Sequence, residues 1–125
     1  MGKFVIKAKN DKYSFRLKAS NGEIIAVSQS YKSLATCKAG IASVMRCAPV
    51  AAVENQTEEG FAVEKHPKFE VYLDKAGESR FRLKAKNGQV IAASEGYASL
   101  KSCLNGIESV RKNCVEPKIE MDEEA

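Results

Sequence analysis

The sequence predicts an α+β domain built from two copies of one unit, each with three strands and a helix. The first observation is a duplication: residues 15–44 recur as residues 81–110 without insertion or deletion, and most positions are identical. The second is the order of patterns within each copy, because runs of period two flank an Asn-Gly pair and a stripe of helical period follows. One helix covers one face of a small sheet, so we expect two layers with both helices on one face.

Each copy begins with two strands in which apolar and polar residues alternate. They span residues 4–8 and 13–19 in the first copy, and residues 69–73 and 81–85 in the second. An Asn-Gly pair follows each second strand, and between alternating runs it is the strongest short-range hairpin signal. We expect a two-residue turn with Asn21 and Gly22 both at positive φ. That register turns Ile24 toward the helix and Ile25 toward the open face of the sheet.

A serine precedes a helical apolar stripe in each copy, which predicts helices capped by Ser33 and Ser99. Gly40 and Gly106 occupy equivalent positions inside these helices, where glycine costs up to ~1 kcal/mol relative to alanine. We therefore expect the two glycines to permit close contact between helix and sheet. The tyrosine ahead of each cap is expected to pack at the corner between strand and helix.

A short last strand is expected after each helix, over residues 50–53 in the first copy and 118–120 in the second. The expected boundaries are repeat 1 at residues 1–53, an acidic linker at 54–67, repeat 2 at 68–120 and an acidic tail at 121–125. All four segments are expected to belong to one compact domain.

Charge is segregated along the chain, which has 20 basic and 16 acidic residues. Nine of the acidic residues, but only two of the basic ones, lie in residues 49–66 and 115–125. The repeats are therefore strongly basic, and their summed field favours negatively charged partners. The alternative is that the charge only keeps the protein soluble. The acidic tail can also fold back over a basic surface and mask it.

The four cysteines form neither a CxxC pair nor a zinc-binding spacing, and the chain has a single histidine. Cys37 and Cys103 lie on the helical stripes, so we expect buried, reduced thiols. Cys47 and Cys114 lie near the helix ends, where we expect greater exposure. We predict neither a metal nor a cofactor.

One pattern occurs twice: FRLKAxNGxxIAxS, then a tyrosine, a serine-capped helix and a GIxSV close. It resembles the YegP-like family of small bacterial and archaeal proteins, also called DUF1508 or UPF0339, over nearly the whole chain except the linker and tail. The resemblance implies two β3-α-β units that form one antiparallel sheet and exchange their C-terminal strands. It implies no established activity and no catalytic residues.

An enzyme needs convergent catalytic groups, and the sequence suggests none. The one histidine, His66, lies beside Pro67 in the linker, and no nucleophile has an evident base. We therefore predict a binding or interaction module that is not an enzyme. No apolar run approaches the roughly 18 residues of a membrane span, so we expect a cytoplasmic monomer with an internal pseudo-twofold axis and no membrane partner.

The strongest binding feature is the open sheet face, which is predicted to carry cations beside one tyrosine. The candidate residues are Lys7, Arg16, Lys18, Tyr72, Arg82 and Lys84. Such a face can follow a phosphate backbone while a base rests on Tyr72, as in sheet-based binders of single-stranded nucleic acid. An ordinary solvated sheet is one alternative. The other is a protein partner, or self-association, through an apolar stripe on this face formed by Val5, Ile25, Val27 and Ile91.

Overall fold

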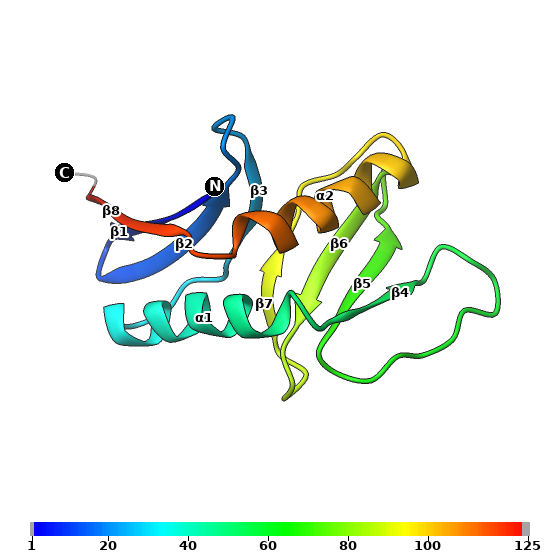
Figure 1. Ribbon diagram of the computed structural model, residues 1–125, viewed down its shortest axis with the longest axis horizontal. Coiled ribbons are helices and arrows are strands. Elements are labelled where there is room, and N and C mark those ends of the chain that lie inside the picture. Colours follow the sequence, from blue (N-terminus) through cyan, green and yellow to red (C-terminus); the bar gives the residue numbers. More distant parts are fainter. Residues whose placement is uncertain (1, 124–125) are drawn as a thin grey trace.

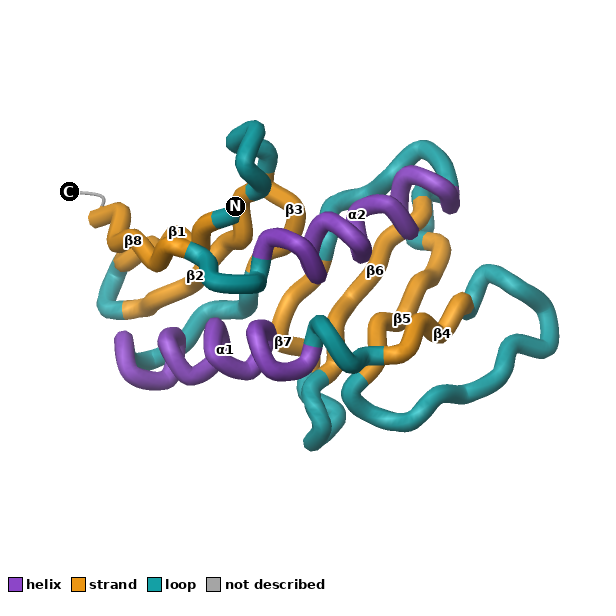
Figure 2. The backbone as a smooth tube through the Cα atoms, viewed as in Figure 1, coloured by secondary structure: helices purple, strands orange, loops and turns teal. Residues whose placement is uncertain are grey.

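The computed structural model describes residues 2–123, which form one eight-stranded sheet with two helices on one face (Figure 1, Figure 2). The strands are β1 (Lys3–Lys9), β2 (Lys12–Lys18), β3 (Ile24–Val27), β4 (Ala52–Asn55), β5 (Lys68–Leu73), β6 (Ser79–Lys84), β7 (Val90–Ala93) and β8 (Lys118–Glu123). The helices are α1 (Leu34–Cys47) and α2 (Leu100–Asn113), each capped by the predicted serine. Neither helix of the described chain is long and apolar enough to cross a bilayer. The predicted two-layer α+β fold is confirmed.

The strand order is β4-β5-β6-β7-β3-β2-β1-β8, so β3 and β7 join the repeats at the centre of the sheet. Each helix packs across this junction, because α1 contacts β2 and β7 while α2 contacts β6, β3 and β2. Neither repeat therefore buries its apolar face with its own helix alone.

The last strand of each repeat joins the sheet of the other repeat, as the resemblance implied. Both join in parallel, β4 beside β5 and β8 beside β1. The sheet is therefore mixed, whereas a wholly antiparallel one was expected. Parallel pairing is accessible because no tight turn joins the paired strands: residues 56–67 separate β4 from β5, and β1 and β8 are the first and last strands.

The exchanged strands also extend past the expected repeat boundaries. β4 covers residues 52–55, two residues later than expected, and so includes the start of the segment predicted as a linker. β8 continues to Glu123 and includes most of the predicted tail. Residues 124 and 125 of that tail lie outside the described residues.

The Asn-Gly hairpins differ from the predicted two-residue turn. Ala19 N–H donates to the Glu23 carbonyl (2.9 Å) and Gly22 N–H to the Ala19 carbonyl (2.9 Å), which makes a three-residue loop with only its glycine at positive φ. The Asn21 side chain instead accepts from the Glu23 N–H at 3.0 Å. A bulge then restores the register, so that Ile25 enters the core while Ile24 is 39% exposed.

The second hairpin repeats this correction. Its register also shifts by one residue, and Ile91 lies in the core while Val90 is 37% exposed. The Asn-Gly pair suits both turns, because the three-residue loop needs a left-handed residue only at glycine. The Asn-Gly pattern therefore predicted both hairpins correctly, but not the length of their loops.

The two helix glycines allow close helix-to-sheet packing, as predicted. A Cβ atom at Gly40 would overlap the Tyr31 hydroxyl and lie 3.1 Å from the Phe15 ring. That tyrosine stacks on Phe15, with ring centroids 6.2 Å apart. Gly106 meets the equivalent pair in the same way. The tyrosines ahead of the caps are thus packing residues.

Gly40→Ala is expected to destabilise the protein although alanine favours helix. The propensity gain is ~1 kcal/mol, whereas overpacking costs about 1–3 kcal/mol, so we expect a net loss of about 1 kcal/mol in urea unfolding. In a Tyr31→Ala background the overlapping ring is absent and the same substitution is expected to stabilise. A stabilising Gly40→Ala in the unmodified protein would contradict this account.

All four cysteines are free and buried. This confirms the expectation for Cys37 and Cys103 and corrects the one for Cys47 and Cys114, which are only 8% and 2% exposed. The helix ends are covered because the repeats meet there: Arg111 of α2 donates hydrogen bonds to two carbonyls just beyond α1. Burial raises the pKa of the Cys103 thiol to about 11.

Candidate functional site on the open sheet face

The face of the sheet opposite the helices carries charged side chains from both repeats. We call its β1–β2 part the repeat-1 half and its β5–β6 part the repeat-2 half. Strand pairing puts the same positions side by side in each half, since Val5 faces Arg16 in the first and Glu70 faces Arg82 in the second. The two halves can therefore be compared position by position.

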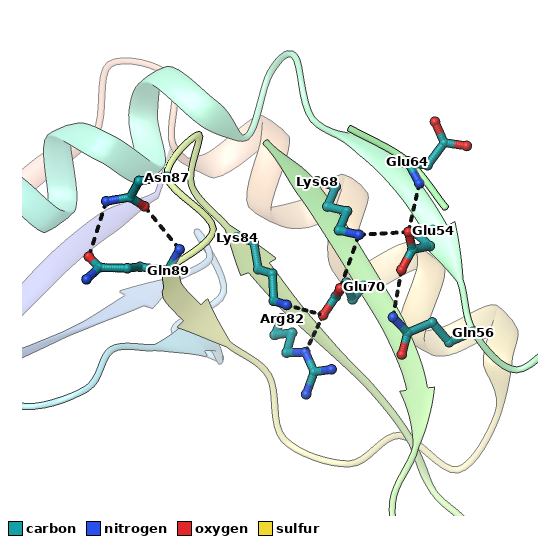
Figure 3. A network of polar contacts seen from close by, with 9 residues as sticks. All are labelled: Glu54, Gln56, Glu64, Lys68, Glu70, Arg82, Lys84, Asn87 and Gln89. Carbon is teal, nitrogen blue, oxygen red and sulfur yellow. Dashed lines mark hydrogen bonds and ion pairs between the residues drawn. The ribbon is translucent and has the colours of Figure 1, made fainter. Parts of the chain in front are cut away.

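In the repeat-2 half, Glu70 lies at the centre of an ion network (Figure 3). One of its oxygens accepts from Arg82 Nε at 2.6 Å and lies 3.2 Å from Lys84 Nζ. The other lies 3.3 Å from Lys68 Nζ. Its side chain is only 5% exposed, so the three cations largely replace water around this carboxylate.

The network continues to the exchanged strand β4. Lys68 Nζ donates to Glu54 at 2.8 Å, and both side chains are buried. Glu54 also accepts from the Gln56 side chain at 2.6 Å and from the Glu64 N–H at 2.8 Å (Figure 3). One carboxylate therefore fastens the segment between β4 and β5 to the sheet, which makes the start of the predicted linker part of the fold.

These contacts shift the pKa values of the three buried groups. Burial opposes ionisation of Glu54, but the hydrogen bonds from Lys68, Gln56 and the Glu64 N–H outweigh it and lower the pKa to about 2. Burial also opposes ionisation of Glu70, and the bonds from its three cations nevertheless hold its pKa below the ordinary value. The bond to Glu54 raises the pKa of Lys68. Glu54, Glu70 and Lys68 are therefore all charged at neutral pH.

The lowered pKa of Glu54 predicts acid sensitivity. Its folded-state pKa lies below the unfolded one, so this carboxylate stabilises the fold fully above about pH 4.5 and loses that contribution as the pH falls toward about 2. We expect the stability difference between the unmodified protein and Glu54→Gln to shrink between about pH 6 and about pH 3 in urea unfolding. A difference independent of pH would contradict the assignment.

The repeat-1 half keeps the cations of this network but lacks its central carboxylate. Lys3, Arg16 and Lys18 occupy the positions of Lys68, Arg82 and Lys84, and Glu120 of β8 occupies that of Glu54. Val5 stands where the other half has Glu70. Lys3 lies 3.4 Å from Glu120, in a solvent-exposed pair. Among the described side chains, those of residues 2–121, no ion pair involves Arg16 or Lys18.

The six candidate residues thus fall into two groups. Lys7, Arg16 and Lys18 lie together on β1 and β2 in the repeat-1 half. Arg82 and Lys84 belong to the ion network of the repeat-2 half. The Arg82 guanidinium also lies 4.5 Å from the ring centroid of Tyr72, which occupies the face on which a base was expected to rest. The alternation along residues 69–73 also places Glu70 on this face, but the sequence analysis did not predict its pairing with Arg82, which the cross-strand register could have suggested.

The apolar stripe expected on the open face is not formed. Ile25 and Ile91 lie in the core after the bulges, and Val5 is only 6% exposed. Val27 is half-buried. The proposed surface for a protein partner or for self-association therefore loses its basis. The predicted register was one residue off near the turns for Ile25 and Ile91, whereas Val27 keeps the predicted pairing with Arg16.

The comparisons with known proteins match both repeats. The family model described as a domain of unknown function, DUF1508, matches residues 8–55 and 74–120. The chain belongs to the DUF1508 family. A relative, the UPF0339 protein YegP of Yersinia pestis, is 45% identical over 107 residues, which are 86% of this chain and 82% of the relative.

Another DUF1508 relative has about the length of one repeat. A UPF0339 protein of Methanosarcina acetivorans is 56% identical over 52 residues, which are 42% of this chain but 90% of the relative. This supports the interpretation of the chain as a duplicated unit.

Two solved structures share the fold. The solution structure of yegP from E. coli, described as a protein of unknown function, has a TM-score of 0.78 and 32% identity, covering 99% of this chain and 95% of that one. The solution structure of the UPF0339 protein SO3888 from Shewanella oneidensis has a TM-score of 0.79 and 30% identity, covering 98% and 92%.

Proposed function

We propose that this DUF1508 protein is a non-catalytic binding module that holds a negatively charged ligand on the repeat-1 half of its open face. The observation that carries the proposal is the valine at position 5. Both halves present the same cations, but Glu70 neutralises those of the repeat-2 half, whereas Val5 leaves Arg16 and Lys18 without a carboxylate between them. Unneutralised neighbouring cations attract anions, and the attraction weakens with salt.

The geometry favours recognition by charge over base stacking. Tyr72 lies in the neutralised half and has the guanidinium of Arg82 over its ring. A polyanion such as single-stranded nucleic acid would therefore bind through its phosphates, without the aromatic platforms that retain bases. The non-catalytic part of the proposal is supported by the cysteines, which are all buried. A cytoplasmic location is part of the same proposal, supported by the absence of disulfides among these four residues.

The test is a matched pair of double variants, Arg16→Gln/Lys18→Gln and Arg82→Gln/Lys84→Gln. Fluorescence anisotropy of a labelled single-stranded oligonucleotide is measured at about 50 mM and about 200 mM salt. We expect the first variant to weaken binding by roughly tenfold or more, because two charge-assisted contacts are lost. The second removes equal charge and is expected to change affinity by less than about threefold.

Circular dichroism establishes that both variants are folded before their affinities are compared. Equal losses in the two variants would mean that only net charge matters, and would refute an assignment to one half of the face. Tight binding that is insensitive to salt would refute recognition by charge.

A further inference from the structure

The end of the β1–β2 hairpin forms a basic depression on the open face. Its volume is about 540 Å³, and its lining includes Lys7, Lys9, Lys12, Ser14, Arg16 and Ser30. Strand pairing sets Lys7 opposite Ser14 and Lys9 opposite Lys12, so four cations from two strands converge on one concave surface. The volume lies within the range of small-molecule sites, roughly 300–1,000 Å³.

The repeat-2 hairpin shows that the fold does not need these cations. Tyr72 stands at the position of Lys7, and Asp74 and Glu78 stand at those of Lys9 and Lys12. Asp74 accepts from Arg80 Nε at 2.6 Å and from two backbone N–H groups of its own turn. Equivalent strand ends thus carry an acidic, internally paired hairpin in one repeat and a basic, hollowed one in the other, although the first turn is one residue shorter.

We propose that this depression binds a polyphosphate chain, either free or as the phosphoanhydride group of a nucleotide. The inference rests on the proposed anion-binding function and names its ligand class. Lys9, Lys12 and Arg16 around so small a space match an anion that concentrates several charges, whereas a nucleic acid strand offers one charge per phosphodiester. The guanidinium of Arg16 donates bidentate hydrogen bonds suited to phosphate oxygens. The lysines act as point charges and the two serine hydroxyls as further donors.

The contacts within the described chain leave Lys9, Lys12 and Arg16 available to a ligand. Among residues 2–121, whose side chains the structure describes, no ion pair involves Lys9, Lys12 or Arg16. Lys9, Lys12 and Ser30 are exposed, and Ser14 and Arg16 are half-buried. A phosphate chain can therefore enter from solvent and contact Arg16, which also lines the depression.

The experiment titrates the full chain, labelled with ¹⁵N, with inorganic tripolyphosphate, and follows the backbone amide shifts. We expect saturable changes confined to the hairpin end around residues 7–16 and to Ser30. Lys9→Gln/Lys12→Gln is expected to weaken tripolyphosphate binding at least tenfold. The matched control, Lys65→Gln/Lys75→Gln, removes two exposed lysines elsewhere and is expected to leave binding within twofold. ATP and AMP, titrated alongside, distinguish the two sources of the phosphate chain.

Equal affinity for tripolyphosphate and ATP assigns the free chain, and tighter ATP binding assigns the nucleotide. Affinity for AMP equal to that for ATP would overturn the polyphosphate assignment. Binding of the oligonucleotide without confined shifts from tripolyphosphate would overturn this inference and leave the proposed function standing. If tripolyphosphate changes only the amide shifts of the hairpin end and the oligonucleotide does not bind, the depression is supported as the binding site and the function is limited to compact anions. Equal weakening by the two lysine pairs would overturn the site.

Discussion

Replacing Lys68 with methionine is expected to lower the free energy of unfolding by about 3 kcal/mol. Methionine fills a similar volume, but it leaves Glu54 and Glu70 facing each other with no cation between them. Their side chains are only 2% and 5% exposed, so water does not replace the lost ammonium group. The measurement is urea unfolding at neutral pH.

The duplication supplies the control for this change. Lys3→Met removes the equivalent lysine of repeat 1, whose partner Glu120 is 3.4 Å away and 48% exposed. Exposed pairs of this kind contribute less than about 1 kcal/mol. Equal losses at the two positions would show that burial of the repeat-2 network adds nothing. We also expect the loss of unfolding free energy in Lys68→Met to become smaller at acidic pH, because protonation removes the repulsion between the carboxylates of Glu54 and Glu70.

The sequence was sufficient for the elements and their layering because each depends on local periodicity. Alternation predicted that Phe15 and Phe81 point inward, and the serines predicted both helix starts. Gly40 predicted a close helix-to-sheet contact, which the structure shows at Tyr31 and Phe15. Such signals lie within a few neighbouring residues. The length of a hairpin loop is not determined in this way, because Asn-Gly suits both a two-residue and a three-residue loop. This difference of one residue decides whether Ile25 is exposed or buried.

The site was harder to predict because its contacts join segments that are distant in the chain. Glu54 meets Lys68 only because β4 leaves its own repeat and pairs in parallel with β5. Cys47 is covered for a similar reason, since the end of α1 lies against the other repeat. The number of charges along the strands does not distinguish the two halves of the open face. The cross-strand register does, because it sets Glu70 beside Arg82 and Val5 beside Arg16.

Val5→Glu is expected to abolish most anion binding without unfolding the protein. The new carboxylate would occupy the position that Glu70 holds in repeat 2, beside cations equivalent to those that pair with Glu70. Lys3, Arg16 and Lys18 are already in place to satisfy it, so burial of the charge is compensated. Those same cations would then be withdrawn from an external ligand. We expect oligonucleotide affinity to fall at least tenfold and its salt dependence to weaken.

The control is Val5→Gln, which introduces a side chain of nearly the same size without charge. It cannot neutralise Arg16, so it is expected to retain affinity within about threefold of the unmodified protein. A folded Val5→Glu protein that binds as well as Val5→Gln would refute the role assigned to the missing carboxylate. A decrease in affinity only in Val5→Glu would mean that Val5 keeps the repeat-1 cations available to a ligand. The equivalent position of repeat 2 carries Glu70, which pairs with the equivalent cations of that repeat.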